Sequence, residues 1–482
     1  MSTGTVPTPK TKIVCTIGPA SSEPATLRAL CEAGMDVVRI NMSHTSADEC
    51  RRMVRDARKC ADQLGVPLGI LVDLQGPKIR LGKLDRPVSL DPGDSVVLVS
   101  EGVEAGENEL PVTYDALADD VANGDRILVD DGRVELRVRE VAPHRVRTEV
   151  AVGGTVRSGK GINLPGVRVS APGLTEKDHA DIEVAREIDA DYVALSFVRS
   201  AQHVQELRDQ LPEGMMVMTK IEKDSALDDL DAILSSSDAV VVARGDLGTE
   251  LPFEQVPLTQ KRIVRAANER FCPVVVATEM FESMIERPRP TRAEVSDAAN
   301  AILEGTDAVM LSAETAVGKY PVKTVEALTR VIAEIETRGS TTARRPIYDV
   351  ADVPARLEGA DLSSTELAVA RATLEAADAV RAPAIVTFTK SGHTARVVAS
   401  RRPPVPVMAI TDSGRVYRQL ALVWGVVPIV QAGEATYETM WETARSHLLQ
   451  RGMAEEGDRI VLTAGMPFQV RGTTNMMHVQ TV

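Results

Sequence analysis

The chain has few aromatic residues, few cysteines and no long apolar run. Aromatic side chains make up 3% of the 482 residues. The five cysteines are odd in number and contain no CxxC pair, which excludes a disulfide framework and favours reduced thiols. No stretch is apolar for long enough to cross a bilayer, and the first residues lack the apolar core of a signal peptide. We therefore expect a cytoplasmic protein without membrane association.

Positively charged residues are also fewer than negatively charged ones. The chain carries 55 Lys and Arg against 69 Asp and Glu, which gives a formal net charge of −14. Such an acidic chain lacks the broad cationic surface that a nucleic-acid backbone requires, so we expect no nucleic-acid partner. The same deficit does not exclude small phosphorylated ligands, because these need only a few local cations.

Eight short β-branched runs alternate with amphipathic helical stretches. This alternation is typical of a parallel sheet covered by helices, and eight strands close a (β/α)8 TIM barrel. Each run passes at its C-terminal end into a polar cluster, which is where such barrels carry their chemistry. The runs are residues 12–18, 37–41, 69–73, 192–196, 216–220, 239–243, 273–277 and 308–312.

The spacing of the runs breaks once, between the third and the fourth, by roughly a hundred residues, a length that demands an inserted domain. The inserted sequence contains the β runs 95–99, 126–129 and 134–138, with turn signals at 91–93, 123–124 and 131–132. We expect a small β-barrel lid that leaves and re-enters at the catalytic end of the barrel. Its closure would exclude water from a bound ligand.

A third domain is expected after the helix-breaking stretch 339–346. Four further β runs, at 384–388, 407–410, 426–430 and 459–463, alternate there with helices and predict a small α/β sheet. The expected organisation is a discontinuous barrel of residues 1–73 and 166–338, a lid of residues 74–165, and a C-terminal domain of residues 339–482.

Two segments place a cation two residues before a carboxylate. Lys220 precedes Glu222, and Arg244 precedes Asp246. If both segments are strands, side chains two apart share a face, and all four groups can converge on one anionic ligand. Two carboxylates suit a hard divalent ion, so this pattern predicts a metal and phosphate site. The alternative is a pair of strand-end ion pairs that satisfy buried charges.

Motifs at seven of the predicted strand ends resemble those of pyruvate kinases, in order and over essentially the whole chain. The resemblance implies transfer of the phosphoryl group of phosphoenolpyruvate to ADP, giving ATP and pyruvate in the last step of glycolysis. It also implies a homotetramer whose C-terminal domain binds an allosteric effector. The motifs read IGPAS at 17–21, RINMSH at 39–44, GPKIR at 76–80, TKIE at 219–222, ARGDLG at 243–248, ATEM at 277–280 and LSAET at 311–315.

The resemblance implies a role for each charged residue of these motifs. Glu222 and Asp246 would hold Mg²⁺ or Mn²⁺. Lys220 would stabilise charge on the moving phosphoryl group and on the enolate, and Arg39 would grip the phosphate. The backbone of Arg244, Gly245 and Asp246 would meet the substrate carboxylate, since a glycine allows close approach. Phosphoryl transfer needs such groups because it proceeds mostly by positioning and charge neutralisation.

Hydroxyl groups and nucleotide contacts complete the implied site. Thr278 would lie beside the enolate face that receives a proton, and either Thr278 or Ser312 could take part in the relay. Strand-end hydroxyls are otherwise common caps. The implied contacts to the ADP phosphates are Asn41, His44, Arg80 and Lys160, of which Lys160 lies where the lid returns and His44 has a purely structural alternative.

One departure from the family pattern concerns potassium. Many members carry a glutamate where this chain has Lys78, and Leu74 and Gln75 replace a threonine and a lysine of the potassium-dependent pattern. An ammonium at position 78 could supply the charge that K⁺ supplies elsewhere. We therefore expect a K⁺-independent, lysine-containing subgroup; the alternative is a solvated lysine at the lid base. The family groups that hold K⁺ match Asn41, Ser43, Asp73 and the backbone of Leu74.

The segment 389–394, which reads TKSGHT, follows a predicted strand and opens a predicted helix. Its amides and hydroxyls can cradle a phosphate, although the spacing is not a Walker motif. It resembles the family's effector loop, and the glycine-poor start of 465–475 favours AMP or a sugar monophosphate over fructose bisphosphate. An ordinary capped helix start is the alternative. The predicted effector residues are Thr389, Lys390, Ser391, Gly392, His393 and Thr394.

Two other classes of protein share parts of this pattern. A lyase or mutase acting on phosphoenolpyruvate or pyruvate would also use a metal held by Glu and Asp beside an arginine, but it has no need of an ADP-facing lid. A catalytically silent regulatory paralogue would have lost at least one of Lys220, Glu222, Asp246 or Thr278, and all four are present.

Overall fold

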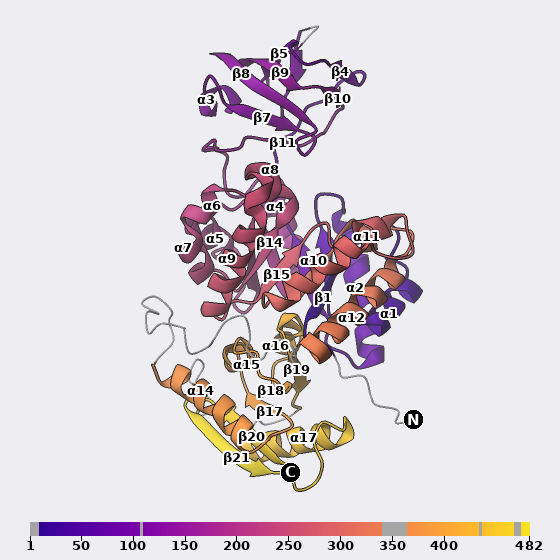
Figure 1. Cartoon of the computed structure of the whole chain (residues 1–482), viewed down its shortest axis with the longest axis vertical. Coiled ribbons are helices and arrows are strands. Elements are labelled where there is room, and N and C mark those ends of the chain that lie inside the picture. The colour runs from indigo at the N-terminus through magenta and orange to yellow at the C-terminus, as the bar shows by residue number, and fades with distance from the viewer. Residues whose placement is uncertain (1–8, 107–108, 340–363, 433–435, 467–473) are drawn as a thin grey trace.

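The computed structural model describes residues 9–106, 109–339, 364–432, 436–466 and 474–482. These residues form three units along the long axis of the molecule: a β-rich lid at one end, a barrel in the middle and an α/β unit at the other end (Figure 1). Residues 340–346 of the expected linker and most of the stretch 465–475 lie outside the described residues. In the described part of the chain, no helix is long and apolar enough to span a membrane.

The middle unit is a closed barrel of parallel strands in the order β1-β16-β15-β14-β13-β12-β3-β2. The predicted TIM barrel is therefore confirmed, and each of its strands coincides with one of the eight predicted runs. The strands are β1 (Lys12–Thr16), β2 (Val37–Asn41), β3 (Gly69–Asp73), β12 (Tyr192–Leu195), β13 (Met216–Ile221), β14 (Ala239–Ala243), β15 (Val274–Ala277) and β16 (Ala308–Leu311).

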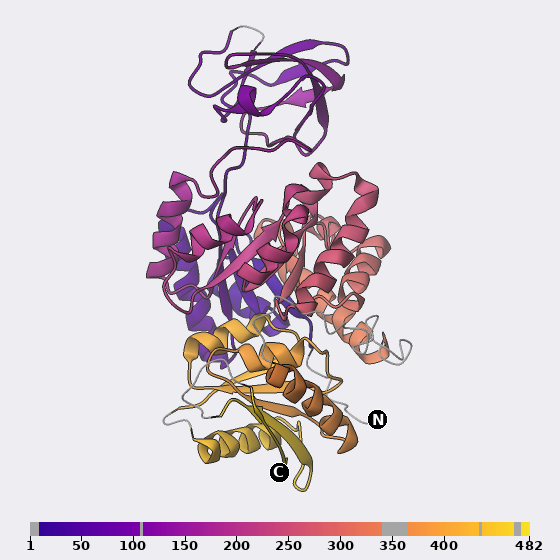
Figure 2. The same cartoon turned by 90° about the vertical axis from the view of Figure 1, so that its left-hand side faces the viewer.

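Helices surround the barrel (Figure 2) and bury the outward-facing side chains of its strands. Successive residues of β1 alternate between two apolar layers, because side chains alternate along a strand. Ile13 and Cys15 pack in the outer layer, whereas Val14 packs inside the barrel. The long helices are α1 (Pro24–Ala33), α2 (Ala47–Leu64), α4 (Glu176–Glu187), α5 (Ala201–Arg208), α7 (Leu230–Ser236), α9 (Val256–Glu269), α10 (Arg292–Leu303) and α12 (Pro321–Glu334).

Short helical turns follow several strands at the end of the barrel that faces the lid. They are α6 (Ser225–Asp228), α8 (Arg244–Glu250), α11 (Ala313–Ala316) and the 3-10 turns η1 (Phe253–Gln255) and η2 (Glu282–Ile285), while η3 (Ile335–Gly339) extends α12 as a π-helical turn. Of these, α8 matters most for the site, because it begins at the residue directly after β14.

A recurring aspartate fixes the opposite end of the barrel. Each of four aspartates directly precedes a strand and accepts a hydrogen bond from the backbone amide of a neighbouring strand. Sequence analysis did not identify this repeat, because Asp is also a routine turn residue. Asp36, Asp191, Asp238 and Asp307 accept from Ile13, Ile70, Val217 and Val274 at 2.8, 2.9, 2.9 and 3.0 Å respectively.

The lid consists of a six-stranded sheet in the order β11-β7-β8-β9-β5-β6 and a two-stranded sheet of β10 and β4. We expected a closed small barrel; among the described residues β4 and β10 instead pair only with each other. The lid elements are β4 (Val88–Leu90), β5 (Ser95–Val99), β6 (Glu109–Pro111), α3 (Leu117–Asp120), β7 (Arg126–Val129), β8 (Val134–Ala142), β9 (Arg145–Val152), β10 (Gly154–Val156) and β11 (Ile162–Asn163).

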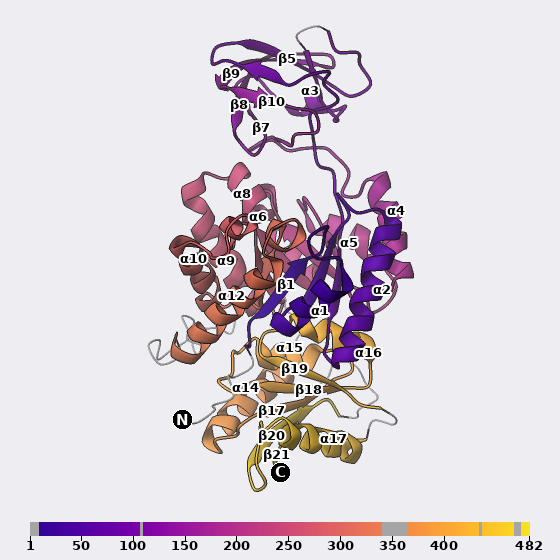
Figure 3. The ribbon, with the colours of Figure 1, turned by 90° about the vertical axis from the view of Figure 1, so that its right-hand side faces the viewer.

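The C-terminal unit is a five-stranded sheet in the order β19-β18-β17-β20-β21 (Figure 3). Four strands match the predicted runs, but the antiparallel edge strand β21 was missed because its sequence MMHVQT is poor in β-branched residues. The elements are α14 (Ser364–Ala379), β17 (Ile385–Phe388), α15 (His393–Ala399), β18 (Val407–Thr411), α16 (Gly414–Gln419), η5 (Leu420–Leu422), β19 (Val426–Val430), α17 (Tyr437–Gln450), β20 (Arg459–Ala464) and β21 (Met476–Thr481).

The C-terminal unit docks on the aspartate-lined end of the barrel. Arg418 Nε of α16 lies 2.9 Å from Asp191 Oδ1, and Arg402 Nη1 lies 3.1 Å from Asp307 Oδ1. The hydroxyl of Tyr192 donates to the carbonyl oxygen of Gln419 at 2.9 Å. Two of the four aspartates therefore bind a strand amide and an interdomain arginine at the same time.

Asp191 should make the free energy of unfolding depend on pH. Burial raises its pKa to about 6, although the charges of Arg418 and Arg58 oppose the shift. The folded protein thus holds this proton more tightly than the unfolded chain does. The resulting stability is complete below about pH 4 and is lost as the pH rises through 6, by on the order of 2–3 kcal/mol. Asp191→Asn should remove this component of the unfolding free energy in urea titrations between pH 4 and 7.

Asp189→Asn is the matched control, because it removes a more exposed partner of the same Arg418. This variant should keep the wild-type pH dependence. Identical pH profiles for wild type and Asp191→Asn would contradict the assignment.

Candidate active site

The strand ends that face the lid gather a cluster of buried charges. Lys220, near the end of β13, places its Nζ 2.9 Å from Glu222 Oε1 and 3.5 Å from Asp73 Oδ1. The same Nζ donates to Ser196 Oγ at 2.9 Å. The side chains of Asp73 and Glu222 are 2% and 0% exposed, so this ammonium is the counter-ion for two carboxylates that are withdrawn from water.

Arg39 joins the cluster from β2. Its Nη2 and Nε lie 2.6 and 2.7 Å from Asp73 Oδ2, and its Nη1 donates to Thr16 Oγ1 at 2.8 Å. Four strands, β1, β2, β3 and β13, thereby contribute to one network. The structure thus brings together Arg39, Asp73, Lys220 and Glu222, as their positions at strand ends predicted.

The pKa shifts of Asp73 and Lys220 favour the charged forms of these two groups. Burial alone would raise the pKa of Asp73, but the charges of Lys220 and Arg39 lower it below its ordinary value. Burial would likewise lower the pKa of Lys220, yet Asp73 and Glu222 raise it well above its ordinary value. Burial and the negative charge of Asp246 raise the pKa of Glu222. Lys220 is therefore a permanent cation at the mouth of the barrel.

Glu222 and Asp246 suit a magnesium-like ion. Glu222 Oε2 accepts from the Phe197 amide at 2.7 Å, whereas the buried Oε1 has the charge of Lys220 beside it but no aligned hydrogen bond. Asp246 Oδ1 lies 3.4 Å from Lys78 Nζ. In the described part of the chain, no group of three or more His, Cys, Asp or Glu could hold a metal. Mg²⁺ needs only one or two carboxylates, because waters and substrate oxygens complete its octahedron.

Arg244 and Asp246 do not lie on a strand, so the prediction that strand alternation places them on one face is wrong. Strand β14 ends at Ala243, and Arg244 already begins α8. Arg244 does not converge on Lys220: its Nη1 pairs with Asp297 Oδ2 at 2.6 Å, and its Nη2 donates to the carbonyl oxygen of Thr278 at 2.6 Å. The helical turn changes the direction of the side chain, and Arg244 holds neighbouring segments of the site in place.

Thr278 has a strained backbone. Its φ is +71°, a left-handed conformation that a β-branched residue rarely adopts. Its Oγ1 accepts from the Gly245 amide at 2.7 Å and donates to the carbonyl oxygen of Ala277 at 2.6 Å. Such strain is typical of functional sites. On the neighbouring strand, Ser312 follows β16, and its amide donates to Glu314 Oε2 at 2.7 Å.

The expected nucleotide contacts are divided between the barrel and the lid base. Burial and the charges of Arg80, Arg39 and Lys78 lower the pKa of His44, so this ring is neutral at pH 7. Arg80 Nη1 donates to the carbonyl oxygen of Gly159 at 3.0 Å, and Lys160 Nζ pairs with Asp130 Oδ1 at 2.7 Å. Both cations are thus held at the lid base.

The groups that match the family's K⁺ position already have partners. Asn41 Oδ1 accepts from the Ser43 amide at 3.1 Å, and the carbonyl oxygen of Leu74 accepts from Ser196 Oγ at 2.8 Å. Lys78 pairs with Asp246. Sequence reasoning missed Ser196, which links Lys220 to Leu74. Its position as the last residue of the fourth predicted run was the available signal.

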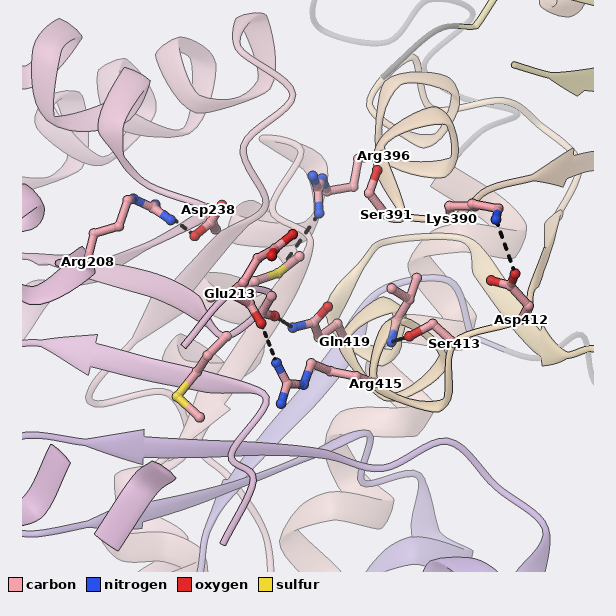
Figure 4. Close-up of a pocket in the computed structure, with 14 residues that line it drawn as sticks. Arg208, Glu213, Asp238, Lys390, Ser391, Arg396, Asp412, Ser413, Arg415 and Gln419 are labelled. Carbon is pink, nitrogen blue, oxygen red and sulfur yellow. Dashed lines mark hydrogen bonds and ion pairs between the residues drawn. The ribbon is translucent and has the colours of Figure 1, made fainter. Parts of the chain in front are cut away.

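The predicted effector segment borders a cavity of about 620 Å³ between the barrel and the C-terminal unit (Figure 4). Of the six predicted effector residues, Lys390 and Ser391 line this cavity. Lys390 Nζ lies 3.6 Å from Asp412 Oδ2. Arg396 also lines the cavity and forms no ion pair with any described residue; its Nη1 lies 3.9 Å from Met216 Sδ.

The other effector candidates lie outside the lining of this cavity. Burial and the charge of Arg396 lower the pKa of His393 to about 4, so this side chain supplies no positive charge at neutral pH. Thr394 Oγ1 forms a hydrogen bond with Thr474 Oγ1 at 2.8 Å, and Thr389 is buried. Gly392 has a φ of +78° just before α15, a conformation suited to glycine.

These features define a class of protein. A TIM barrel whose strand ends gather cations beside two carboxylates, beneath an inserted lid, is the framework of a metal-assisted enzyme that acts on an anionic substrate.

Comparisons with known proteins identify the family. The family model for the pyruvate kinase barrel domain matches residues 8–325. The family model for the pyruvate kinase alpha/beta domain matches residues 367–480. The pyruvate kinases of Agrobacterium vitis and Mycobacterium tuberculosis are 43% and 42% identical over 472 and 475 residues, which cover 98% of each chain. That of Bacillus licheniformis is 41% identical over 480 residues, 98% of this chain and 80% of the relative.

The chain belongs to the pyruvate kinase family and is a phosphotransferase. The reaction of this family moves the phosphoryl group of phosphoenolpyruvate to ADP and leaves pyruvate, and its members generally need a divalent metal. The predicted family, fold and reaction are therefore confirmed.

Proposed function

We propose that Lys220 and Arg39 are the cations that stabilise the transferring phosphoryl group in this enzyme. The observation that carries this proposal is the buried position of Lys220 between Asp73 and Glu222. Because these carboxylates hold the ammonium in place before substrate arrives, no reorganisation is needed during transfer. Arg39, held by Asp73, would grip the phosphate, and Lys220 would also neutralise the enolate that remains.

Glu222 and Asp246 would hold the divalent ion, Mg²⁺ or Mn²⁺. When bound, it would supply Lewis-acid chemistry that neutralises negative charge on the reacting groups. Asp246 currently faces Lys78 at 3.4 Å, so this lysine would shift as the carboxylate takes a metal. The amide of Gly245 would meet the substrate carboxylate, in exchange for its present bond to Thr278.

A hydroxyl would then relay a proton to the enolate, passing on its own proton as it takes one from water. Thr278 is the better candidate, because its Oγ1 already bonds the Gly245 amide that would face the substrate. Ser312, on the adjacent strand end, is the alternative. Asn41, His44, Arg80 and Lys160 would contact the ADP phosphates, with Arg80 and Lys160 reaching them from the lid base. We propose that the chain is divided into a catalytic barrel (1–73 and 166–338), a lid (74–165) and a C-terminal domain (339–482).

The isosteric variant Glu222→Gln tests the metal role. It should lower kcat/KM for ADP-dependent pyruvate formation by on the order of 10²–10³, because it removes one charged ligand while keeping the shape of the side chain. The measurement is pyruvate release from phosphoenolpyruvate with ADP and Mg²⁺. Glu183→Gln, at an exposed residue that pairs only with Arg186 among the described residues, is the control and should behave as wild type. Full activity of a folded Glu222→Gln, or pyruvate release without ADP, would overturn the proposal.

Lys78 is the basis of the second proposal, independence from K⁺. Its ammonium lies at the site, 3.4 Å from Asp246 and 5.7 Å from the centre of the Phe197 ring. A side-chain ammonium on a flexible stem can supply, from near this position, the positive charge of a bound monovalent ion.

Replacing tetramethylammonium chloride with KCl should leave the wild-type rate unchanged. The variant Lys78→Glu should be slower and should regain activity with K⁺. Lys83→Glu, an exposed lysine further along the same segment, is the control and should show no K⁺ response. Strong stimulation of the wild type by K⁺ at saturating metal and substrates would refute this role.

We also propose a homotetramer that is regulated by AMP or a sugar monophosphate at residues 389–394. Lys390 and Ser391 line the interdomain cavity, and so does Arg396, whose guanidinium forms no ion pair with any described residue (Figure 4). Lys390→Met should weaken activation by such an effector about tenfold, through loss of one charge-assisted contact, while basal activity stays the same. Initial rates against effector concentration test this. An unchanged activation constant would exclude Lys390 from the site.

A further inference from the structure

The two segments that connect the lid to the barrel pair with each other. We call residues 76–81 and 159–163 the hinge ribbon. Ile162 N donates to the carbonyl oxygen of Ile79 at 2.9 Å, and Leu81 N donates to that of Lys160 at 2.8 Å. Figure 1 shows this ribbon as the link between lid and barrel. Because its strands are bonded together, the ribbon transmits motion of the lid to whatever it touches on the barrel.

The hinge ribbon contacts α8 at both ends. Lys78 Nζ lies 3.4 Å from Asp246 Oδ1 in the first turn of this helix. Asn163 Nδ2 donates to Glu250 Oε1, at the last residue of the helix, at 3.1 Å. The helix that carries one metal carboxylate is therefore held at each end by the base of the lid.

Glu250 also binds the segment that carries the other metal carboxylate. Lys223, the residue after Glu222, donates from Nζ to the same Glu250 Oε1 at 2.5 Å. The side chain of Glu250 is 1% exposed and that of Lys223 14% exposed. A buried carboxylate cannot leave its partners without a large desolvation cost, so Asn163, Glu250 and Lys223 should move as one unit.

We propose that Glu250 is a positioning residue that couples the orientation of the lid to the two metal carboxylates. It joins the exit strand of the lid to both Asp246, on its own helix, and Glu222, next to Lys223. Because Lys78 would leave Asp246 when a metal binds there, this coupling passes through the junction of Asn163, Glu250 and Lys223. By linkage, metal binding at the two carboxylates orders residues 159–163 through this junction, and ordering of these residues tightens metal binding by the same factor. This inference rests on the proposed metal role of Glu222 and Asp246. It assigns functions to Asn163, Lys223 and Glu250, whose contacts join the lid to the barrel.

The test uses Mn²⁺ as the probe, with the full chain and no nucleotide. Asn163→Leu removes the lid's donor and leaves the Glu250–Lys223 pair in place, which favours folding. Mn²⁺ affinity is measured by electron paramagnetic resonance, and hydrogen exchange reports on the amides of 159–163. Mn²⁺ should slow this exchange in the wild type. In Asn163→Leu the slowing should disappear, and Mn²⁺ affinity should fall five- to tenfold.

Two further variants separate coupling from simple packing. The double variant Asn163→Asp with Glu250→Gln exchanges the carboxylate and the amide at the junction. It should restore both the Mn²⁺ affinity and the slowing of hydrogen exchange by Mn²⁺. Ser158→Ala is the matched control, because Ser158 Oγ bonds only Leu84, inside the lid, among the described residues. This control should bind Mn²⁺ and respond to it as the wild type does.

The outcomes distinguish this inference from the proposed function. If Asp246→Asn binds Mn²⁺ as tightly as the wild type, the metal site itself is elsewhere and both fail. If Mn²⁺ binding depends on Asp246 but Asn163→Leu keeps wild-type affinity and protection, the metal site stands. Glu250 would then only satisfy the charge of Lys223, and the coupling would be refuted.

Discussion

The site depends on one buried ammonium held between two buried carboxylates. Lys220 can keep its charge inside the barrel only because Asp73 and Glu222 face it, and they in turn could not stay ionised there without it. Arg39 and Ser196 bond to members of the same group. This mutual requirement fixes the relative positions of β2, β3, β12 and β13 at the mouth of the barrel. The charged groups of the site are therefore in position before a charged substrate binds.

The two ends of the barrel use aspartates for different purposes. At the end of the barrel that contacts the C-terminal unit, each of four aspartates accepts a hydrogen bond from a strand amide. Asp191 and Asp307 also bind arginines of the C-terminal unit. The bonds of Asp191 and Asp307 join the two domains. At the open end, Glu222 keeps one buried oxygen without an aligned hydrogen bond, and Asp246 is partly exposed. Carboxylates with unused acceptor capacity are the ones able to take a metal ion.

Sequence patterns predicted what local geometry determines. The eight barrel strands and the meeting of Lys220, Glu222 and Arg39 follow from strand periodicity and from the parallel arrangement of strand ends. The direction of Arg244 did not follow, because α8 begins at the residue directly after β14, so the alternation of side chains along a strand no longer applies there. The edge strand β21 was missed because few of its residues are β-branched. The bond between Asn163 and Glu250 was also beyond prediction, because it joins segments far apart in the chain, about which local patterns carry little information.

The most direct test of the account is chemical rescue of a missing ammonium. Lys220→Ala opens a space at the barrel mouth while Asp73 and Glu222 remain. Added ethylammonium should enter that space and restore phosphoryl transfer from phosphoenolpyruvate to ADP in proportion to its concentration, whereas neutral ethanol of similar size should not. Equal effects of the two compounds, or no rescue in a variant that folds and binds Mn²⁺ normally, would contradict the claim that a fixed positive charge at this position drives the reaction.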